Sequence, residues 1–470
     1  CNSETGLRVL GSRAASLISV LSHQLFGSFF NEDKQLITFS DSVQDAAHRA
    51  GFFTARTYPL LLRSLIARAI DKHDIKTIAD LAETVPDFAR DLYSSDAAFV
   101  GTFAAPDMEW QSHFKELKET NKLPAKTNLP KNVKARLSWE AISEFGLKSH
   151  LGRSLVKSKF AATSFDRDEL DQVANQIHST LLEEIAELST LEISKVEAFL
   201  ISFLNLLIIN GAIVHSSLKN YILNAGDTYV HNKIGETSYY MPSWGRRSRK
   251  PRFLSVRKVS NSFDYLAKKS HGSSLYLTVL LKTLLSDDAA FATSYSETIF
   301  TRVLVHLKKA GILISYEVKG EEVYGLNPDS IIISRDLNRI ECSECGTPHN
   351  VDTGLADYWL GSPCLVPSCK GHLEVGTRSE RNLSWNNFEL VRINGFEHTG
   401  LLERDIREKV ENSFIKGRDE WDINLLSATP TLEMGIDIGD LSSVALCSVP
   451  PAQSNYLQRI GRAGRRDGNA

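Results

Sequence analysis

The stretch QRIGRAGRRDG, at residues 458–468, combines four arginines with closely spaced glycines. Because glycine has no Cβ, Gly461 and Gly464 allow the backbone to approach a phosphate group closely. Arg462 and Arg465 are three positions apart, and on a helix such residues lie on one face. Two guanidinium groups there would neutralise the charge that develops during phosphoryl transfer. The alternative is a solvated basic end of a helix, which the helix dipole favours.

Four of the six cysteines form a second chemical cluster. Their pattern is C-x₂-C-x₁₈-C-x₄-C, and the residues are Cys342, Cys345, Cys364 and Cys369. In a large chain without a secretion signal, such clustering favours a metal site over disulfides. Four thiolates leave no open coordination position, so we predict a structural zinc. The alternative is four unrelated reduced thiols.

The segment 244–258 has seven basic residues and no acidic one. The whole chain carries 54 Lys and Arg against 57 Asp and Glu, so nucleic-acid binding would need a local patch of this kind. We expect Trp244 and Phe253 to stack on bases. The residues expected to contact phosphates are Arg246, Arg247, Arg249 and Arg252. A solvated loop is the alternative.

Two distant parts of the chain have the pattern of one parallel sheet. Residues 34–42 read as a buried strand followed by a helix, and from 388 onward strands and helices alternate. Such alternation is typical of a parallel sheet with crossover helices. The residues between the two parts would form an insertion. Within it, residues 296–328 read as a helix, a stop at Gly311 and a hairpin. This order is found in winged-helix domains, and it also occurs in many other α+β folds.

These segments resemble a known set of motifs in the correct order. LITFSDSVQDAAHRAG, HTGLLERDIREKVENSF, SATPTLEMGIDIGDLSSV and NYLQRIGRAGRRDG are similar to motif IV, the helix before motif V, motif V and motif VI. Those motifs belong to the second, C-terminal RecA-like lobe of superfamily 2 DEAD/DEAH-box helicases. The form of these motifs resembles that in large bacterial helicases such as those of phage-defence systems. The resemblance covers residues 31–70 and 388–470, and the large insertion departs from the compact lobe of the simplest members.

The resemblance implies roles for individual residues. Arg462 and Arg465 match arginine fingers, and Gln458 matches a position that contacts nucleotide or couples the lobes. The residues expected at bound ATP are Gly435, Asp437, Gly461 and Gly464. The residues expected at the nucleic-acid backbone are Ser40, Asp41, Thr429 and Thr431. Two alternatives stay open, since Asp437 also suits a turn and Ser40 with Asp41 also suits a helix cap.

The sequence contains no GxxxxGK[ST] loop to cradle the β- and γ-phosphates and position Mg²⁺. We therefore expect ATP and Mg²⁺ to be shared with a first RecA-like lobe of the same full-length protein, upstream of Cys1. The chain alone would then be an inactive fragment. Without a membrane-length apolar run or a signal peptide, we expect no membrane partner and a cytoplasmic location. Nucleic acid is the expected partner, with DNA favoured over RNA.

The predicted fold is an α/β RecA-like parallel sheet, interrupted by a large, mainly helical insertion with winged-helix-like units and a zinc-binding module. The predicted parts are an N-terminal helical segment at 1–30, the first part of the lobe at 31–70, the helical and winged-helix-like insertion at 71–335, the zinc-binding module at 336–387 and the second part of the lobe at 388–470. The rival interpretation is a non-catalytic DNA-binding or adaptor protein built on winged-helix and zinc modules.

Overall fold

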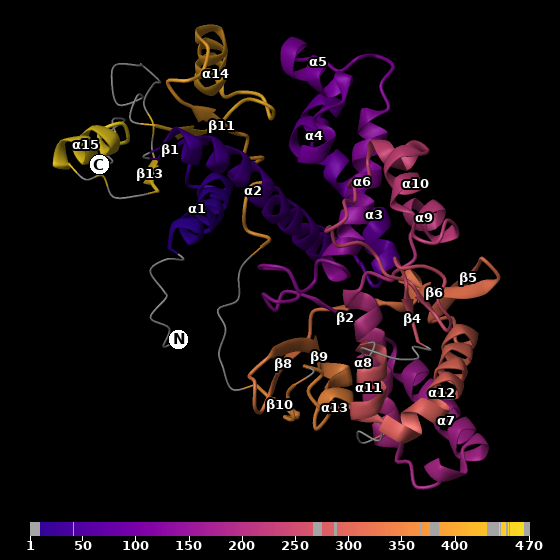
Figure 1. Cartoon of the computed structure of the whole chain (residues 1–470). Coiled ribbons are helices and arrows are strands. Elements are labelled where there is room, and N and C mark those ends of the chain that lie inside the picture. The colour runs from indigo at the N-terminus through magenta and orange to yellow at the C-terminus, as the bar shows by residue number, and fades with distance from the viewer. Residues whose placement is uncertain are drawn as a thin grey trace. The chain divides into compact units, whose positions relative to one another are not determined.

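The computed structural model forms two compact units, whose elements are drawn in Figure 1. Unit 1 comprises residues 1–68, 87–134 and 385–470, and unit 2 comprises residues 69–86 and 135–384. The structure describes residues 10–40, 42–266, 275–285, 289–366, 368–376, 385–429, 441, 443–447, 450 and 452–464. In this part of the chain, no helix combines the length and apolar character needed to cross a membrane.

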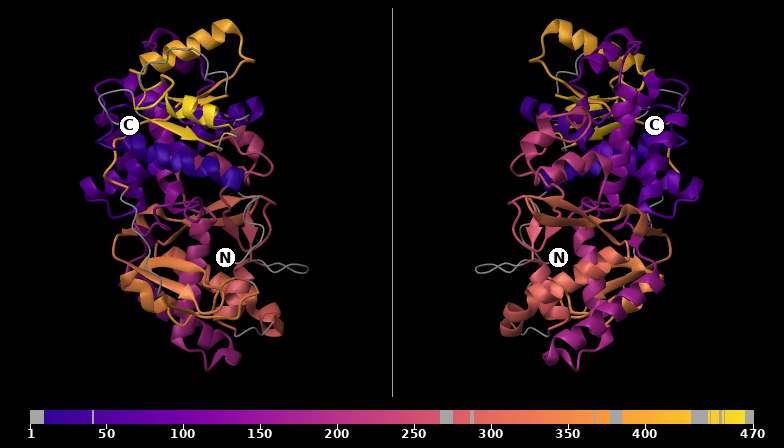
Figure 2. Two further views of the ribbon diagram at one scale, coloured as in Figure 1. Left: turned by 90° about the vertical axis from the view of Figure 1, so that its left-hand side faces the viewer. Right: turned by 90° about the vertical axis from the view of Figure 1, so that its right-hand side faces the viewer.

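Unit 1 contains a four-stranded sheet in which all the strands are parallel, in the order β11-β12-β1-β13. The strands are β1 (Leu36–Phe39), β11 (Gly395–His398), β12 (Leu425–Ala428) and β13 (Val444–Leu446). Strand β1 lies between β12 and β13 although it is far from both in the sequence. Figure 2 shows the indigo N-terminal and yellow C-terminal segments gathered in this unit. The prediction that two distant segments build one parallel sheet is therefore confirmed.

Helices cover both faces of this sheet. On one face, Ile37 and Phe39 pack with Val410 and Phe414 of α14 (Arg404–Lys416). On the other face, Leu36 packs with residues of α1 (Leu10–Gly27) and α2 (Val43–Lys72). Successive side chains of a strand point to opposite faces, and β1, buried along its whole length, supplies both cores.

Three local features of unit 1 depart from simple sequence patterns. Helix α2 continues through Pro59, although proline removes one backbone donor. The alternation predicted from residue 388 onward begins later, since residues 388–393 form no strand; the buried Arg392 side chain there donates to the carbonyls of Gly101 and Ala104, at 3.0 and 2.6 Å. Helix α6 begins at Leu129 although Pro130 follows directly.

Unit 1 also contains α4, α5 and the C-terminal helix α15, and the division of the chain between the units falls within α2, α3 and α6. Their bounds are α4 (Asp96–Phe103), α5 (Ser112–Thr120), α15 (Gln453–Ile460), α3 (Ile78–Asp91) and α6 (Leu129–Phe145).

The described residues of unit 2 form helices and three small sheets, in the strand orders β4-β3-β6-β5, β10-β8-β9 and β2-β7. Its helices are α7 (Arg167–Glu184), α8 (Ile193–Ile209), α9 (Lys219–Leu223), α10 (Thr228–Lys233), α11 (Leu275–Thr283), α12 (Ala289–Lys309) and α13 (Ala356–Trp359). Its strands are β2 (Ala162–Ser164), β3 (Leu254–Ser255), β4 (Asp264–Tyr265), β5 (Leu313–Val318), β6 (Glu321–Leu326), β7 (Ile332–Ser334), β8 (Leu337–Cys342), β9 (Pro348–Asp352) and β10 (Leu373–Val375).

The predicted helix and hairpin are present in unit 2. Helix α12 ends at Lys309, two residues before Gly311, and β5 and β6 then pair antiparallel along their full lengths. The turn between the strands is Lys319-Gly320, with φ values of +54° and +78°. These angles match the tight hairpin turn that suits the twist of the flanking strands.

Candidate functional site

The carboxyl ends of the parallel strands bring predicted site residues together. Phe39 of β1 and Ala428 of β12 are register partners, and β11 ends beside them at His398. Ser40 and Thr429 follow these strands directly. Ligands of open α/β sheets bind outside this edge. Two of the predicted nucleic-acid contacts, Ser40 and Thr429, therefore lie at the edge where such sheets hold ligands.

Both of these residues are buried and hydrogen-bonded. The Ser40 amide donates to the carbonyl of Ala428 at 2.8 Å, and the Ser40 hydroxyl accepts from Arg49 at 3.0 Å. The Thr429 amide donates to the carbonyl of His398 at 3.2 Å, and its side chain is 3% exposed. These bonds join neighbouring strands, so the two residues shape this edge of the sheet.

A buried histidine, His398, pairs with the half-buried Glu411 at the same edge, which the sequence reasoning missed. His398 is 1% exposed, and its Nε2 lies 2.8 Å from Glu411 Oε1 on α14. Its Nδ1, Ser427 Oγ and Thr399 Oγ1 are buried and have no hydrogen-bond partner among the described residues. The available signal was a histidine at the end of a strand, at the start of the HTGL block.

The last turn of α15 is anchored on the sheet by Arg459. This side chain is 1% exposed, and its guanidinium carbon lies 5.5 Å from the centre of the Phe39 ring. The helix ends at Ile460, so the prediction that Arg462 lies on a face of this helix is wrong, whereas Arg465 lies outside the described residues. Arg462 instead lies in the turn that follows.

That turn is tied back to the stretch that carries motif V. The Gly464 amide donates to the carbonyl of Leu441 at 2.9 Å, with φ of +75° at Gly464. Residues other than glycine are strained at this angle. Gly461 follows the last residue of α15. Gln458 is exposed and Arg462 half-buried, so both side chains reach solvent near this turn.

Some predicted site residues lie outside the described part of the chain. They are Asp41, Thr431, Gly435, Asp437 and Arg465. Their predicted roles stay predictions.

The basic segment in unit 2 differs in part from its prediction. Arg246, Arg247 and Arg249 are exposed, as phosphate contacts must be. Trp244 and Phe253 are 4% and 0% exposed, so the prediction that they stack on bases is wrong. Trp244 stacks on His231 with ring centroids 3.6 Å apart.

Arg252 also differs from its three neighbours in the segment. Its guanidinium pairs with Asp264 at 2.7 Å, which partly neutralises its charge. Of the four predicted phosphate contacts, three are therefore exposed and free of a close acidic partner in the described part of the chain: Arg246, Arg247 and Arg249.

The four clustered cysteines meet at one point of unit 2. Their sulfurs all lie within 4.8 Å of one another, with Cys342 and Cys369 at 3.5 Å and Cys345 and Cys364 at 3.7 Å. Tetrahedral zinc with bonds of about 2.3 Å needs sulfurs about 3.8 Å apart. A Cβ at Gly371 would lie 2.6 Å from the Cys342 sulfur, so this close approach requires glycine. The donor set and the spacing therefore fit zinc.

The surroundings of the cysteines also suit a metal-bound thiolate cluster. Hydrogen bonds from Thr347 lower the pKa of Cys345 to about 6, whereas burial raises the pKa of Cys364 to about 12. Lys282 of α11 donates to the carbonyls of Cys364, Val366 and Cys369 at 2.8, 2.9 and 2.8 Å. Zinc with four thiolates carries a net charge of −2, which this ammonium group partly balances. The sequence offered no signal for Lys282.

Comparison with known proteins gives one family match and several relatives. Residues 370–467 match the family described as the helicase conserved C-terminal domain. The Druantia protein DruE of Escherichia coli is 31% identical over 172 residues, which is 31% of this chain and 9% of that protein. An uncharacterised ATP-dependent helicase of Methanocaldococcus jannaschii is 43% identical over 74 residues, or 16% of this chain and 10% of that protein.

A third relative is the ATP-dependent helicase Lhr-Core of Sulfolobus acidocaldarius, which is 40% identical over 67 residues, or 14% of this chain and 7% of that protein. The chain thus spans a tenth or less of the length of these relatives. No solved structure matches the chain. The resemblance predicted from motifs IV to VI is confirmed: the C-terminal part of this chain carries the conserved C-terminal domain of superfamily 2 helicases.

Proposed function

We propose that the chain supplies the second motor lobe of an ATP-dependent helicase or translocase that acts on nucleic acid, with DNA favoured over RNA. The observation that carries this proposal is the parallel sheet of unit 1, in which β1 lies between β12 and β13. This pairing unites the ends of motifs IV and V at one ligand-binding edge. A protein that used only separate DNA-binding modules would not need this arrangement.

In this proposal, Arg462 and Arg465 act on ATP that a first RecA-like lobe holds together with Mg²⁺. Arginine stays protonated at physiological pH, so each side chain offers fixed positive charge to the transition state. Arg459, packed over Phe39, fixes the end of α15, from which Gln458 and Arg462 reach solvent. Gly435, Asp437, Gly461 and Gly464 complete the proposed nucleotide contacts.

The nucleic-acid backbone in this proposal meets Ser40, Asp41, Thr429 and Thr431 in unit 1. In unit 2 we assign the same role to Arg246, Arg247 and Arg249. The helix and hairpin of α12, β5 and β6 support a winged-helix-like module. The four cysteines would hold a structural zinc, which fixes the turn before β9 and carries out no chemistry of its own.

ATP hydrolysis tests the motor role. The sequence lacks a GxxxxGK[ST] loop, so we expect the 470-residue chain alone to hydrolyse no ATP. In the full-length protein, Arg462→Ala should lower DNA-stimulated turnover roughly 10³-fold. Arg404→Ala is the matched control, because Arg404 is exposed and pairs with Glu408 on the surface of α14. DNA-stimulated hydrolysis by the chain alone, or equal effects of the two variants, would contradict the proposal.

A further inference from the structure

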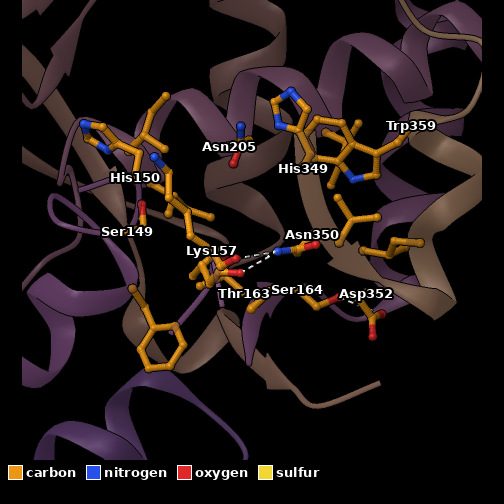
Figure 3. Close-up of a pocket in the computed structure, with 18 of the residues that line it drawn as sticks. Ser149, His150, Lys157, Thr163, Ser164, Asn205, His349, Asn350, Asp352 and Trp359 are labelled. Carbon is orange, nitrogen blue, oxygen red and sulfur yellow. Dashed lines mark hydrogen bonds between the residues drawn. The ribbon is translucent and has the colours of Figure 1, made fainter. Parts of the chain in front are cut away.

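Unit 2 encloses a cavity of about 560 Å³ that none of the roles above uses. Its walls come from the end of α6, the loop 149–157, strand β2, helix α8, Arg339 of β8 and the segment 347–359, which contains β9 (Figure 3). Small-molecule sites have volumes of about 300–1,000 Å³. The cavity is therefore large enough for a ring system with a substituent.

Aromatic side chains form much of the cavity wall. His349 and Trp359 are stacked with ring centroids 5.9 Å apart and an interplanar angle of 26°. Phe145 and Phe165 line the cavity as well. Burial lowers the pKa of His349, so this ring is neutral at physiological pH. Flat, uncharged surfaces of this kind bind planar aromatic rings by stacking.

One polar side chain between the aromatic side chains of the wall is placed to hydrogen-bond to the edge of a bound ring. Figure 3 shows Asn205 of α8 between His150 on one side and His349 and Trp359 on the other. Within the described residues, the side-chain amide of Asn205 has no hydrogen-bond partner, whereas its backbone belongs to α8. Its amide offers donors and an acceptor side by side, as the edge of a nucleobase does.

Two neighbouring polar residues of the cavity wall already form hydrogen bonds within the protein. Asn350 donates to the carbonyls of Val156 and Lys157 at 2.8 and 3.3 Å, which clamps the loop 149–157 against β9. Asp352 accepts hydrogen bonds from the Ser164 and Ser334 hydroxyls. The Asp352 carboxylate is thus held by the protein, which leaves Asn205 as the amide that is available for recognition.

Positive charge gathers at the His150 side of the cavity. Burial lowers the pKa of His150, and the charges of Arg249 and Lys157 lower it further, so both cations lie close to this ring. Lys157 lines the cavity and has no acidic partner in the described part of the chain. Arg249 belongs to the exposed basic segment. A ligand that combines an aromatic ring with a phosphate matches both sides of the cavity.

We propose that this cavity binds one unstacked nucleobase of a nucleic-acid strand whose backbone runs along Arg246, Arg247 and Arg249. The base stacks on the aromatic wall, Asn205 hydrogen-bonds to its edge, and Lys157 with Arg249 contacts the adjoining phosphate. This inference rests on the proposed nucleic-acid motor function and assigns to the insertion the capture of a single base. A free nucleotide has the same chemistry, so the test must separate the two sources.

The test compares strand binding with and without bases. The 470-residue chain is titrated with a short adenine strand, with the abasic analogue of that strand and with AMP. We expect the abasic strand to bind about tenfold more weakly than the adenine strand. Asn205→Leu keeps the side-chain size and removes the amide, so it should weaken adenine-strand binding and leave abasic-strand binding unchanged. Asn175→Leu, on the exposed surface of α7, is the matched control and should behave like the unaltered chain.

The outcomes separate this inference from the motor proposal. Equal affinity for adenine and abasic strands, in the unaltered chain and in Asn205→Leu, would overturn the base pocket and leave the motor proposal intact. If AMP binding depends on Asn205 while the adenine and abasic strands bind equally, the cavity binds a free nucleotide. The proposal that a nucleic-acid strand supplies the base would then be wrong. If no strand binds at all, both the inference and nucleic-acid binding by this chain fail.

Discussion

Replacing Lys282 by methionine should weaken zinc binding while leaving all four cysteines in place. The Lys282 ammonium donates to three carbonyls of the loop that contains Cys364 and Cys369. Methionine keeps much of the apolar length of lysine and removes the charge and the donors. The loop would then lose both the cross-link that shapes it and the cation that lies near the thiolates.

The size of this effect follows from the geometry. Three short charged hydrogen bonds contribute about 1.5–3 kcal/mol each in favourable cases, but ordering and desolvating the ammonium group offsets most of the sum. Removal of residues that orient metal ligands typically lowers metal affinity 10–100-fold. We expect Lys282→Met to fall in this range, which corresponds to about 1.4–2.7 kcal/mol.

Competition with a chromophoric chelator measures this zinc affinity directly. Lys309→Met, at an exposed position of α12, controls for the loss of one lysine. Circular dichroism in saturating zinc shows whether both variants fold. The reasoning would be refuted if a folded Lys282→Met chain held zinc within twofold of the unaltered chain, because the three bonds would then contribute nothing to the site.

Three further changes test other parts of the structure. Burial alone would raise the pKa of Glu140, but Lys148 and Arg136 lower it to about 2. The charged form of Glu140 therefore stabilises the fold above its ordinary pKa of about 4.5. Urea unfolding should show that Glu140→Gln lowers the free energy of unfolding by roughly 3 kcal/mol at pH 7. The difference between the two chains should shrink as the pH falls from about 5 towards 2. Arg392→Met should lower the free energy of unfolding by about 2–4 kcal/mol, because the carbonyls at the end of α4 lose this donor and the carboxylate of Glu109 keeps only Lys118 of its two cationic partners. Three exposed arginines, Arg246, Arg247 and Arg249, should be replaced together by alanine. The variant should bind single-stranded DNA more weakly, and the slope of log affinity against log salt concentration should become shallower by about 2. An unchanged slope would mean that the segment is a solvated loop.

The sequence predicted the parallel sheet because its strands are short, apolar runs with helices between them. Strand β1 lies inside the predicted run 34–42, and β12 and β13 lie in the stretch from 388 onward in which strands and helices were predicted to alternate. The cysteine cluster could also be predicted from the sequence, because the spacing of the four cysteines indicated a metal site and their sulfurs do lie close together. Periodicity and ligand spacing are local properties of a sequence, and local properties are what a single sequence reveals.

Long-range contacts were not predictable in the same way. Trp244 lies in a run of arginines, and its burial against His231 depends on a helix that packs from elsewhere in unit 2. Arg392 interrupts an apolar run that reads as a strand, and only the carbonyls of α4 explain its burial. His398 and Glu411 are 13 positions apart and pair because α14 returns over the sheet. In each case a charged or polar group is buried because a distant segment supplies its partner.

The cysteine cluster and the base pocket are joined by one short piece of chain, and this connection indicates why a motor insertion would contain both. Cys342 ends β8, Cys345 lies in the following turn, and β9 begins at Pro348. Strand β9 then presents His349 to the cavity and clamps the opposite loop through Asn350. A hairpin this short has little hydrophobic core of its own, so four metal–sulfur bonds would stabilise the pairing of its two strands. On this argument the zinc contacts no substrate, and its contribution is to fix the position of the pocket wall on which the base would stack.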